Sequence, residues 1–172
     1  MSKPSVGRQI LMAALFLGLS AAVAVMGSLA SAPNTDGWYE DAVKVPWSPP
    51  NWLFGPAWTV LYVVIAIVGF LVWRAGYAGG EAPNRAQRAL TIFAVQLVLN
   101  LAWTPVFFAG YPLFGASAWW AGMVVIVLLM AAVVALIIAT ARWSRAAAWM
   151  LVPYLGWLLF ASTLNAGIIV LN

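Results

Sequence analysis

The sequence predicts an all-α membrane protein, a five-transmembrane-helix bundle with its N-terminus inside and its C-terminus outside. Hydrophobic residues make up 65% of the 172 residues and charged residues only 7%, whereas charged residues are roughly a quarter of a soluble domain. The mean hydropathy is +0.98. The few charges separate long uncharged runs, and about 20 apolar residues are enough to cross a bilayer as a helix.

The uncharged runs define the helices in chain order. The run between Arg88 and Arg142 is too long for one helix, and Gly110-Tyr111-Pro112 interrupts it, because proline cannot continue a helical hydrogen-bond ladder. The expected helices are residues 10–30, 53–73, 89–109, 117–140 and 147–171 of a single domain covering residues 1–172. The longest connection is an outer loop at residues 31–52.

The positively charged residues predict the orientation. With the N-terminus inside, the inner segments carry Lys3, Arg8, Arg74, Arg85, Arg88, Arg142 and Arg145. The outer segments carry only Lys44. This bias satisfies the positive-inside rule for bacterial and eukaryotic membrane proteins. The basic residues are therefore topology signals rather than a nucleic-acid-binding stripe, and no nucleic acid partner is expected.

The residue inventory excludes several classes of function. The chain has no cysteine and no histidine, which excludes disulfides, zinc sites of the usual kind, histidine-ligated haem and serine triads, and no metal site is predicted. The four acids, Asp36, Glu40, Asp41 and Glu81, all lie outside the expected helices. Ion-coupled transporters usually keep an ionisable group at membrane depth, so ion coupling is disfavoured.

Eight of the eleven tryptophans fall at expected helix ends or in the outer loop, where the interfacial aromatic belt explains them. These are Trp38, Trp47, Trp52, Trp73, Trp119, Trp120, Trp143 and Trp149. Trp58, Trp103 and Trp157 lie inside helices and need another explanation.

The three inner tryptophans share helix faces with uncharged polar residues, because residues three or four apart lie on one face. The faces are Trp58 and Tyr62; Gln96, Asn100, Trp103 and Phe107; and Tyr154, Trp157, Ala161 and Asn165. Lipid does not solvate amides, so these faces are expected to point inward. Two interpretations stay open: contacts that hold the helices together, or a pocket for a flat, mostly apolar ligand.

The outer loop carries the most specific motif, Trp38-Tyr39-x4-Lys44-x-Pro46-Trp47-Ser48-Pro49-Pro50-x-Trp52-x-Phe54-Gly55-Pro56-Ala57-Trp58-Thr59-x-Leu61-Tyr62. Its prolines favour a stiff, extended strap, while Pro56 suits the first turn of a helix. Such a strap is expected to lie over the outer helix ends as a lid, or to act only as a rigid connector.

This motif resembles the TspO family, which comprises bacterial tryptophan-rich sensory proteins and the mitochondrial translocator protein. Two further stretches agree, Leu99-Asn100-x2-Trp103-x-Pro105-x-Phe107-Phe108 and Pro153-Tyr154-x2-Trp157-x2-Phe160-Ala161-x2-Leu164-Asn165. The family pattern has proline directly after the strap lysine, whereas here Val45 separates Lys44 from Pro46.

The resemblance implies a bundle that is often a homodimer and binds tetrapyrroles such as protoporphyrin IX or haem, with no obligatory cofactor. By motif position, the ligand-lining residues are Tyr39, Phe54, Trp58, Asn100, Trp103, Trp157, Ala161 and Leu164, with Trp120 or its neighbour Trp119. Trp47 of the loop, Tyr62 and Asn165 complete the expected site. The C-terminal Tyr-Arg/Lys pattern of sterol-binding relatives is missing.

Three functions follow from the resemblance. The first is a sensor or regulator that binds porphyrin or haem in the outer half of the bundle. The second is a passive carrier of a lipophilic ligand across the membrane. The third is an enzyme that degrades porphyrin with light and oxygen, for which Trp58 and Trp157 are the candidate catalytic residues. The expected location is the bacterial cytoplasmic membrane, with the outer membrane as an alternative because some family members occur there.

Overall fold

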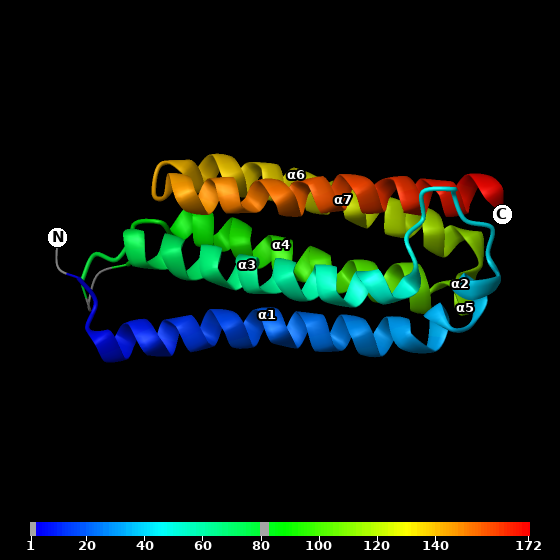
Figure 1. Ribbon diagram of the computed structural model, residues 1–172. Helices are drawn as coiled ribbons and strands as arrows, with labels where there is room; N and C mark the ends of the chain where they lie inside the picture. Colours follow the sequence, from blue (N-terminus) through cyan, green and yellow to red (C-terminus); the bar gives the residue numbers. More distant parts are fainter. Residues whose placement is uncertain (1–2, 80–82) are drawn as a thin grey trace.

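The computed structural model describes residues 3–79 and 83–172, and every regular element in them is helical (Figure 1). The long helices are α1 (Val6–Thr35), α3 (Phe54–Ala75), α4 (Gln87–Thr104), α6 (Ala116–Ala141) and α7 (Arg145–Leu171). With the short flanking turns η1 (Asn51–Leu53) and η2 (Pro105–Ala109), they form five helices long and apolar enough to cross a membrane. The predicted helical class is confirmed, and the chain is a multi-pass integral membrane protein.

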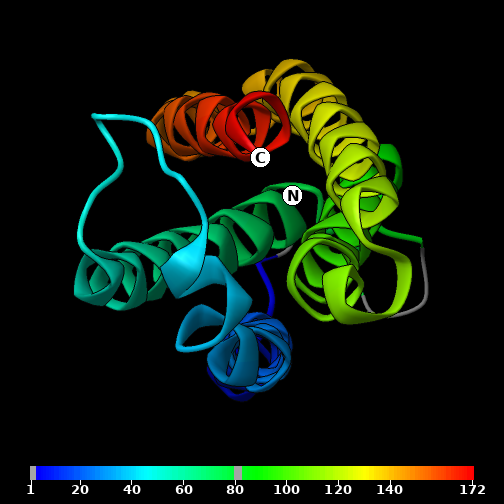
Figure 2. The same ribbon diagram turned by 90° about the vertical axis from the view of Figure 1, so that its right-hand side faces the viewer.

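The helices form a ring when the bundle is seen from one end (Figure 2). Around the ring, α1 packs on α3, α3 on α7, α7 on α6, α6 on α4 and α4 back on α1. The tight turn between α6 and α7 makes them antiparallel neighbours, as short connections usually do. We call the end with the C-terminus the outer end and the end with the N-terminus the inner end, after the predicted orientation.

The inner half of the ring is filled by apolar side chains. Val68, Val72, Leu136 and Leu151 are almost completely buried there. Gly69 of α3 permits the closest approach, because a Cβ at this position would lie 2.5 Å from the ring of Phe16 on α1. Phe16 in turn meets Phe93 edge to face, with ring centroids 5.4 Å apart. This half is therefore close-packed and leaves no room for a larger side chain at position 69.

The first helix is longer than the predicted 10–30. It begins after Ser5, whose Oγ accepts a hydrogen bond from the backbone N–H of Arg8 at 3.3 Å, as an N-cap residue does. It continues through Pro33 to Thr35, and polar side chains of its last turn hydrogen-bond to backbone carbonyls there. Asn34 donates to the carbonyl of Ala30 at 3.2 Å, and Thr35 donates to that of Ala32 at 3.0 Å.

The break in the long uncharged run lies where it was predicted, between the spans Gln87–Ala109 and Ala116–Ala141, but its internal structure was not predicted. The regular helix α4 ends at Thr104, because Pro105 has no N–H to continue the ladder. The wider π-helical turn η2 follows and closes with a hydrogen bond from the N–H of Gly110 to the carbonyl of Pro105. After the short helix α5 (Tyr111–Phe114), the chain reverses at Gly115, whose φ of 58° favours glycine.

The predicted outer loop at residues 31–52 is only partly extended. Residues 31–35 belong to α1, and the short helix α2 covers Trp38–Asp41. The extended strap is residues 42–50, which cross the outer end toward the C-terminus of α7 (Figure 1). Asn172 holds it there by accepting from the N–H of Val43 at 2.9 Å and donating to its carbonyl at 3.1 Å.

Candidate functional site

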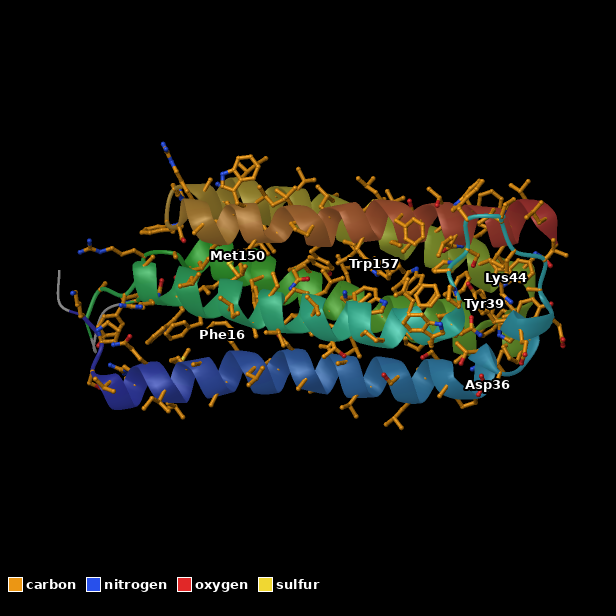
Figure 3. The ribbon with its side chains drawn as sticks, in the orientation of Figure 1. Phe16, Asp36, Tyr39, Lys44, Met150 and Trp157 are labelled. Atoms are coloured by element: carbon orange, nitrogen blue, oxygen red, sulfur yellow. The ribbon has the colours of Figure 1, made fainter. Side chains whose placement is uncertain are left out.

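A cavity of about 550 Å³ lies in the outer half of the bundle. Its walls come from α1, α3, η2 with the end of α4, and α7, while α2 and η1 contribute at its outer end. Figure 3 shows Trp157 between α7 and α3, with Tyr39 and Asp36 toward the same end of the bundle and Phe16 and Met150 toward the other. The outer half is therefore hollow where the inner half is filled.

Aromatic rings of α3 and α7 line one side of the cavity. Trp58 and Tyr62 lie one helical turn apart on α3 and stack, with ring centroids 5.4 Å apart and planes 29° apart. Trp157 of α7 meets Trp58 edge to face at 6.4 Å and Phe54 at 6.0 Å. On the opposite side, Trp103 stacks on Phe107 at 5.4 Å with an interplanar angle of 9°. These are the surfaces on which a flat apolar molecule packs well.

A buried hydrogen-bond chain closes the floor of the cavity. The hydroxyl of Tyr62 donates to Oδ1 of Asn100 at 2.7 Å, and Nδ2 of Asn100 donates to the hydroxyl of Tyr154 at 2.7 Å. The Tyr154 hydroxyl donates to Oε1 of Gln96 at 3.1 Å. Tyr154, Gln96 and Asn100 are all buried. The chain joins α3, α4 and α7 beneath the cavity and separates it from the inner half.

The nitrogen atoms of two wall tryptophans are covered rather than open to the cavity. Nε1 of Trp103 and Nε1 of Trp157 are buried and have no hydrogen-bond partner among the described residues, and the same holds for Oδ1 of Asn165. Because neighbouring atoms cover them, a molecule in the cavity meets ring faces and edges instead.

The cavity opens between the outer parts of α1 and α3. The exposed members of its lining are Ser28, Ala32, Asp36, Asn51, Trp52, Gly55 and Thr59. All of them belong to the outer part of α1, to η1, to the start of α3, or directly follow α1. We call this opening between α1 and the start of α3 the side opening.

Tyr39 of α2 contributes to the outer part of the lining and is only 5% exposed. Lys44 of the strap lies over its ring, with Nζ 4.9 Å from the centroid, and also donates to the carbonyl of Glu40. Burial raises the pKa of the Tyr39 hydroxyl above its ordinary value of 10.0, and a hydrogen bond with Ser48 opposes that shift. The tyrosine is therefore neutral and fixed between the strap and the cavity at physiological pH.

The structure brings most of the sequence-predicted site residues together. Nine of them line the cavity: Tyr39, Phe54, Trp58, Tyr62, Trp103, Trp157, Ala161, Leu164 and Asn165. Three do not. Asn100 lies beneath the floor, where it binds Tyr62. Trp47 is exposed on the strap and donates from Nε1 to Thr163, and Trp120 is 60% exposed.

Trp119, the alternative to Trp120, is also outside the lining, but it is buried and not part of an exposed belt. It stacks on Tyr111 at 4.6 Å, and both rings contact Trp38, whose Nε1 donates to the carbonyl of Phe108. Trp73 at the inner end of α3 is buried as well. The belt interpretation is therefore wrong for Trp73 and Trp119, because a ring near a helix end still packs inward when its face of the helix does.

The contribution of α1 to the cavity was not predicted. Its lining residues are Ala24, Gly27, Ser28, Ser31, Ala32 and Thr35. They are all small, and they repeat at spacings of three and four, which places them on one helix face. Because these side chains are small, they leave room for the cavity, which the aromatic rings of α3 and α7 line on its other side. The spacing of these small residues could have indicated that this face of α1 points inward. Small residues alone, however, do not indicate a ligand site.

Comparison with known proteins identifies the family. The sequence model of the TspO/MBR family matches residues 16–171. The chain belongs to the TspO/MBR family. It is similar to the tryptophan-rich protein TspO of Chlorobaculum tepidum, with 39% identity over 96% of this chain and 98% of that protein.

Two further relatives show the breadth of the TspO/MBR family. The human translocator protein is 38% identical over 74% of this chain and 70% of its own length. The tryptophan-rich sensory protein of Cereibacter sphaeroides is 32% identical over 88% of this chain and 87% of its own length. The resemblance inferred from the strap and the two aromatic motifs is thereby confirmed.

Proposed function

We propose that this TspO/MBR protein is a membrane sensor or regulator that binds a tetrapyrrole in the outer-half cavity. The observation that carries the proposal is the cavity itself, about 550 Å³ in volume and bordered by the rings of Trp58, Trp103 and Trp157. Sites for ligands of this kind usually measure about 300–1,000 Å³ and are mainly apolar. A flat conjugated ring fits walls made of ring faces and edges.

The chemistry of the lining favours a metal-free porphyrin over haem. Haem iron is held in proteins by histidine, cysteine, methionine or tyrosine. Of these, the described lining residues include only tyrosines, Tyr39 and Tyr62. Tyr39 is buried with its hydroxyl engaged by Ser48, and Tyr62 donates to Asn100. We therefore expect protoporphyrin IX to bind at least as tightly as haem.

The closed floor favours sensing over transport. A carrier must expose its ligand to both sides of the membrane, and the route inward from this cavity passes through the Tyr62–Asn100–Tyr154–Gln96 chain. Opening it would break three hydrogen bonds in a membrane interior, where unpaired polar groups are costly. Ligand entry through the side opening requires no such break.

The experiment is a titration of the purified full-length protein with protoporphyrin IX, following the absorption and emission of the pigment. We expect saturable binding by the wild type. Replacing both cavity indoles, Trp58→Leu with Trp157→Leu, is expected to weaken binding roughly tenfold or more, because each aromatic contact contributes about 0.5–1.5 kcal/mol beyond area burial.

Trp149→Leu is the matched control. Trp149 is 73% exposed near the inner end of α7, so its loss removes an indole without touching the cavity. An equal dissociation constant for the wild type and the double variant contradicts the proposed site. Flux of porphyrin into proteoliposomes faster than into empty vesicles contradicts the choice of sensing over transport.

A further inference from the structure

A second pocket, of about 350 Å³, lies at the inner end of the bundle, at the opposite end from the cavity. Three separate parts of the chain meet there: residues 3–4 before α1, the end of α3 with Tyr77, and the turn between α6 and α7. All three parts lie at the N-terminal end of the bundle in Figure 1. Nothing in the tetrapyrrole proposal uses this pocket.

Positive charge gathers on this pocket. Lys3 and Arg74 line it directly. Two more cations lie on its aromatic lining. Arg8 donates to the hydroxyl of Tyr77 at 2.9 Å, and Arg142 lies over the ring of Trp143 at 5.5 Å. Three of the four acids of the chain, by contrast, belong to the segment between α1 and the strap at the outer end, and the fourth, Glu81, lies outside the described residues.

The N-terminus of α7, which follows the turn between α6 and α7, also favours an anion. Ser144 lines the pocket and caps α7, accepting from the N–H of Ala147 at 3.2 Å. The N-terminus of a helix this long carries a partial positive charge and attracts phosphate groups. The cations and the N-terminus of α7 therefore both attract an anion, although they belong to different elements of the fold.

The rest of the lining is apolar or aromatic. Pro4, Leu71, Ala75 and Trp143 border the same pocket as the two cations. A small hydrated anion gains nothing from such a wall, whereas a molecule with a charged head and an apolar body gains from both parts. Trp143 lies in the turn between α6 and α7 at the inner end of the bundle, and tryptophans are common at the membrane interface.

We propose that this pocket binds a phosphate anion carried on an apolar body, that is, the headgroup of an anionic phospholipid from the inner leaflet. Lys3 and Arg74 pair with the phosphate, the start of α7 orients it, and Leu71 with Pro4 contacts the glycerol and upper acyl region. Basic pockets between helices on the cytoplasmic side of membrane proteins recognise lipids in this way.

The test measures lipid retention by the full-length protein in mild detergent, using native mass spectrometry with short-chain phosphatidylglycerol and phosphatidylcholine. We expect the wild type to retain phosphatidylglycerol in preference to phosphatidylcholine. Each cation near the headgroup contributes roughly fivefold in affinity. Lys3→Gln with Arg74→Gln is therefore expected to weaken phosphatidylglycerol binding by about 25-fold.

Arg85→Gln with Arg88→Gln is the matched control, because it removes the same charge from the same end without touching the pocket lining. We expect it to retain the lipid nearly as the wild type does. An equal loss in both double variants contradicts the proposal, since diffuse surface charge then explains binding. Equal retention of the two lipids by the wild type also contradicts it.

Competition with inorganic phosphate identifies the source of the anion. Phosphatidylglycerol that stays bound in excess inorganic phosphate supports a lipid site, as proposed. Complete displacement, with phosphate itself retained by the wild type and lost in the Lys3→Gln/Arg74→Gln variant, supports the same phosphate contacts but overturns the lipid as the occupant. The tetrapyrrole titration is independent of every one of these results.

Discussion

The two halves of this bundle differ in what fills the space between the same helices. In the inner half, Val72 of α3, Leu136 of α6 and Leu151 of α7 interdigitate until almost no surface is left. In the outer half, α1 presents small residues, and α3 and α7 present rings around a cavity of about 550 Å³. We infer that close packing in the inner half compensates for the stability that the cavity in the outer half costs.

The largest effect is expected from a cavity made in the filled half. Leu151 is completely buried, and Leu→Ala changes at such sites cost about 2–5 kcal/mol in free energy of unfolding. Leu151→Ala should lower the thermal midpoint markedly while leaving porphyrin affinity at low temperature close to that of the wild type. Leu159→Ala, at a position on α7 that is exposed, is the control. Affinity that falls together with stability would show that the halves are not independent.

A smaller effect is expected at the boundary between the halves. Asn100→Leu leaves the hydroxyl of Tyr62 without its acceptor and removes the donor to the hydroxyl of Tyr154, which keeps its bond to Gln96. A buried unpaired group costs about 1–3 kcal/mol, and Tyr62 also loses its fixed position in the cavity lining. Both the thermal midpoint and the porphyrin affinity should fall.

The control for this boundary change is Thr91→Val, which removes an exposed hydrogen bond within α4. It should alter neither the thermal midpoint nor the porphyrin affinity. A change in the midpoint of Asn100→Leu with no change in its affinity would limit the hydrogen-bond chain to a structural role.

Stability at alkaline pH includes a contribution from Tyr39 at the outer end. Burial raises the pKa of Tyr39 above its ordinary value of 10.0, so the folded state resists an ionisation that the unfolded chain undergoes. This contribution is fully present below pH 10.0 and is lost as the pH rises from there toward the folded pKa, by up to about 1.4 kcal/mol per pH unit. Tyr39→Phe should make the decline in stability above that pH less steep. Parallel declines in the two proteins would exclude Tyr39 as a cause.

The smallest effect on stability is expected from the strap. Asn172→Ala removes both hydrogen bonds to Val43, which are exposed and contribute about 1 kcal/mol in total or less. The thermal midpoint should hardly change, but hydrogen exchange at the Val43 amide should accelerate several-fold. Leu171→Ala, at the neighbouring exposed position, should leave that exchange unchanged. Unchanged exchange in Asn172→Ala would show that other contacts hold the strap.

The sequence was sufficient to predict the number of spans and the aromatic part of the lining on α3, α4 and α7. Five uncharged runs give five helices, and polar or aromatic residues three and four apart identify the inward faces of α3, α4 and α7. Rotation about a helix was harder to predict at its ends. Trp119 and Trp120 are adjacent and differ by about 100° around α6, so only the packing of Tyr111 and Trp38 distinguishes the buried ring from the exposed one.

The helix ends and the role of α1 were not predictable from the same signals. Pro33 and Pro105 each remove one backbone donor, yet the first stays inside a helix and the second starts a π-helical turn. The lining face of α1 contains only small residues, which are equally typical of a helix contact.

Because of the side opening between α1 and α3, the measured affinity of a lipophilic ligand depends on the unit in which its concentration is expressed. We expect a lipophilic ligand to reach this opening from the bilayer, where its abundance is a mole fraction and not a molarity in buffer. Adding protein-free vesicles to a saturated sample should therefore empty the cavity by dilution within lipid, even when the total amounts of protein and pigment are constant. Affinities of such a binder are comparable between laboratories only at a stated lipid-to-pigment ratio.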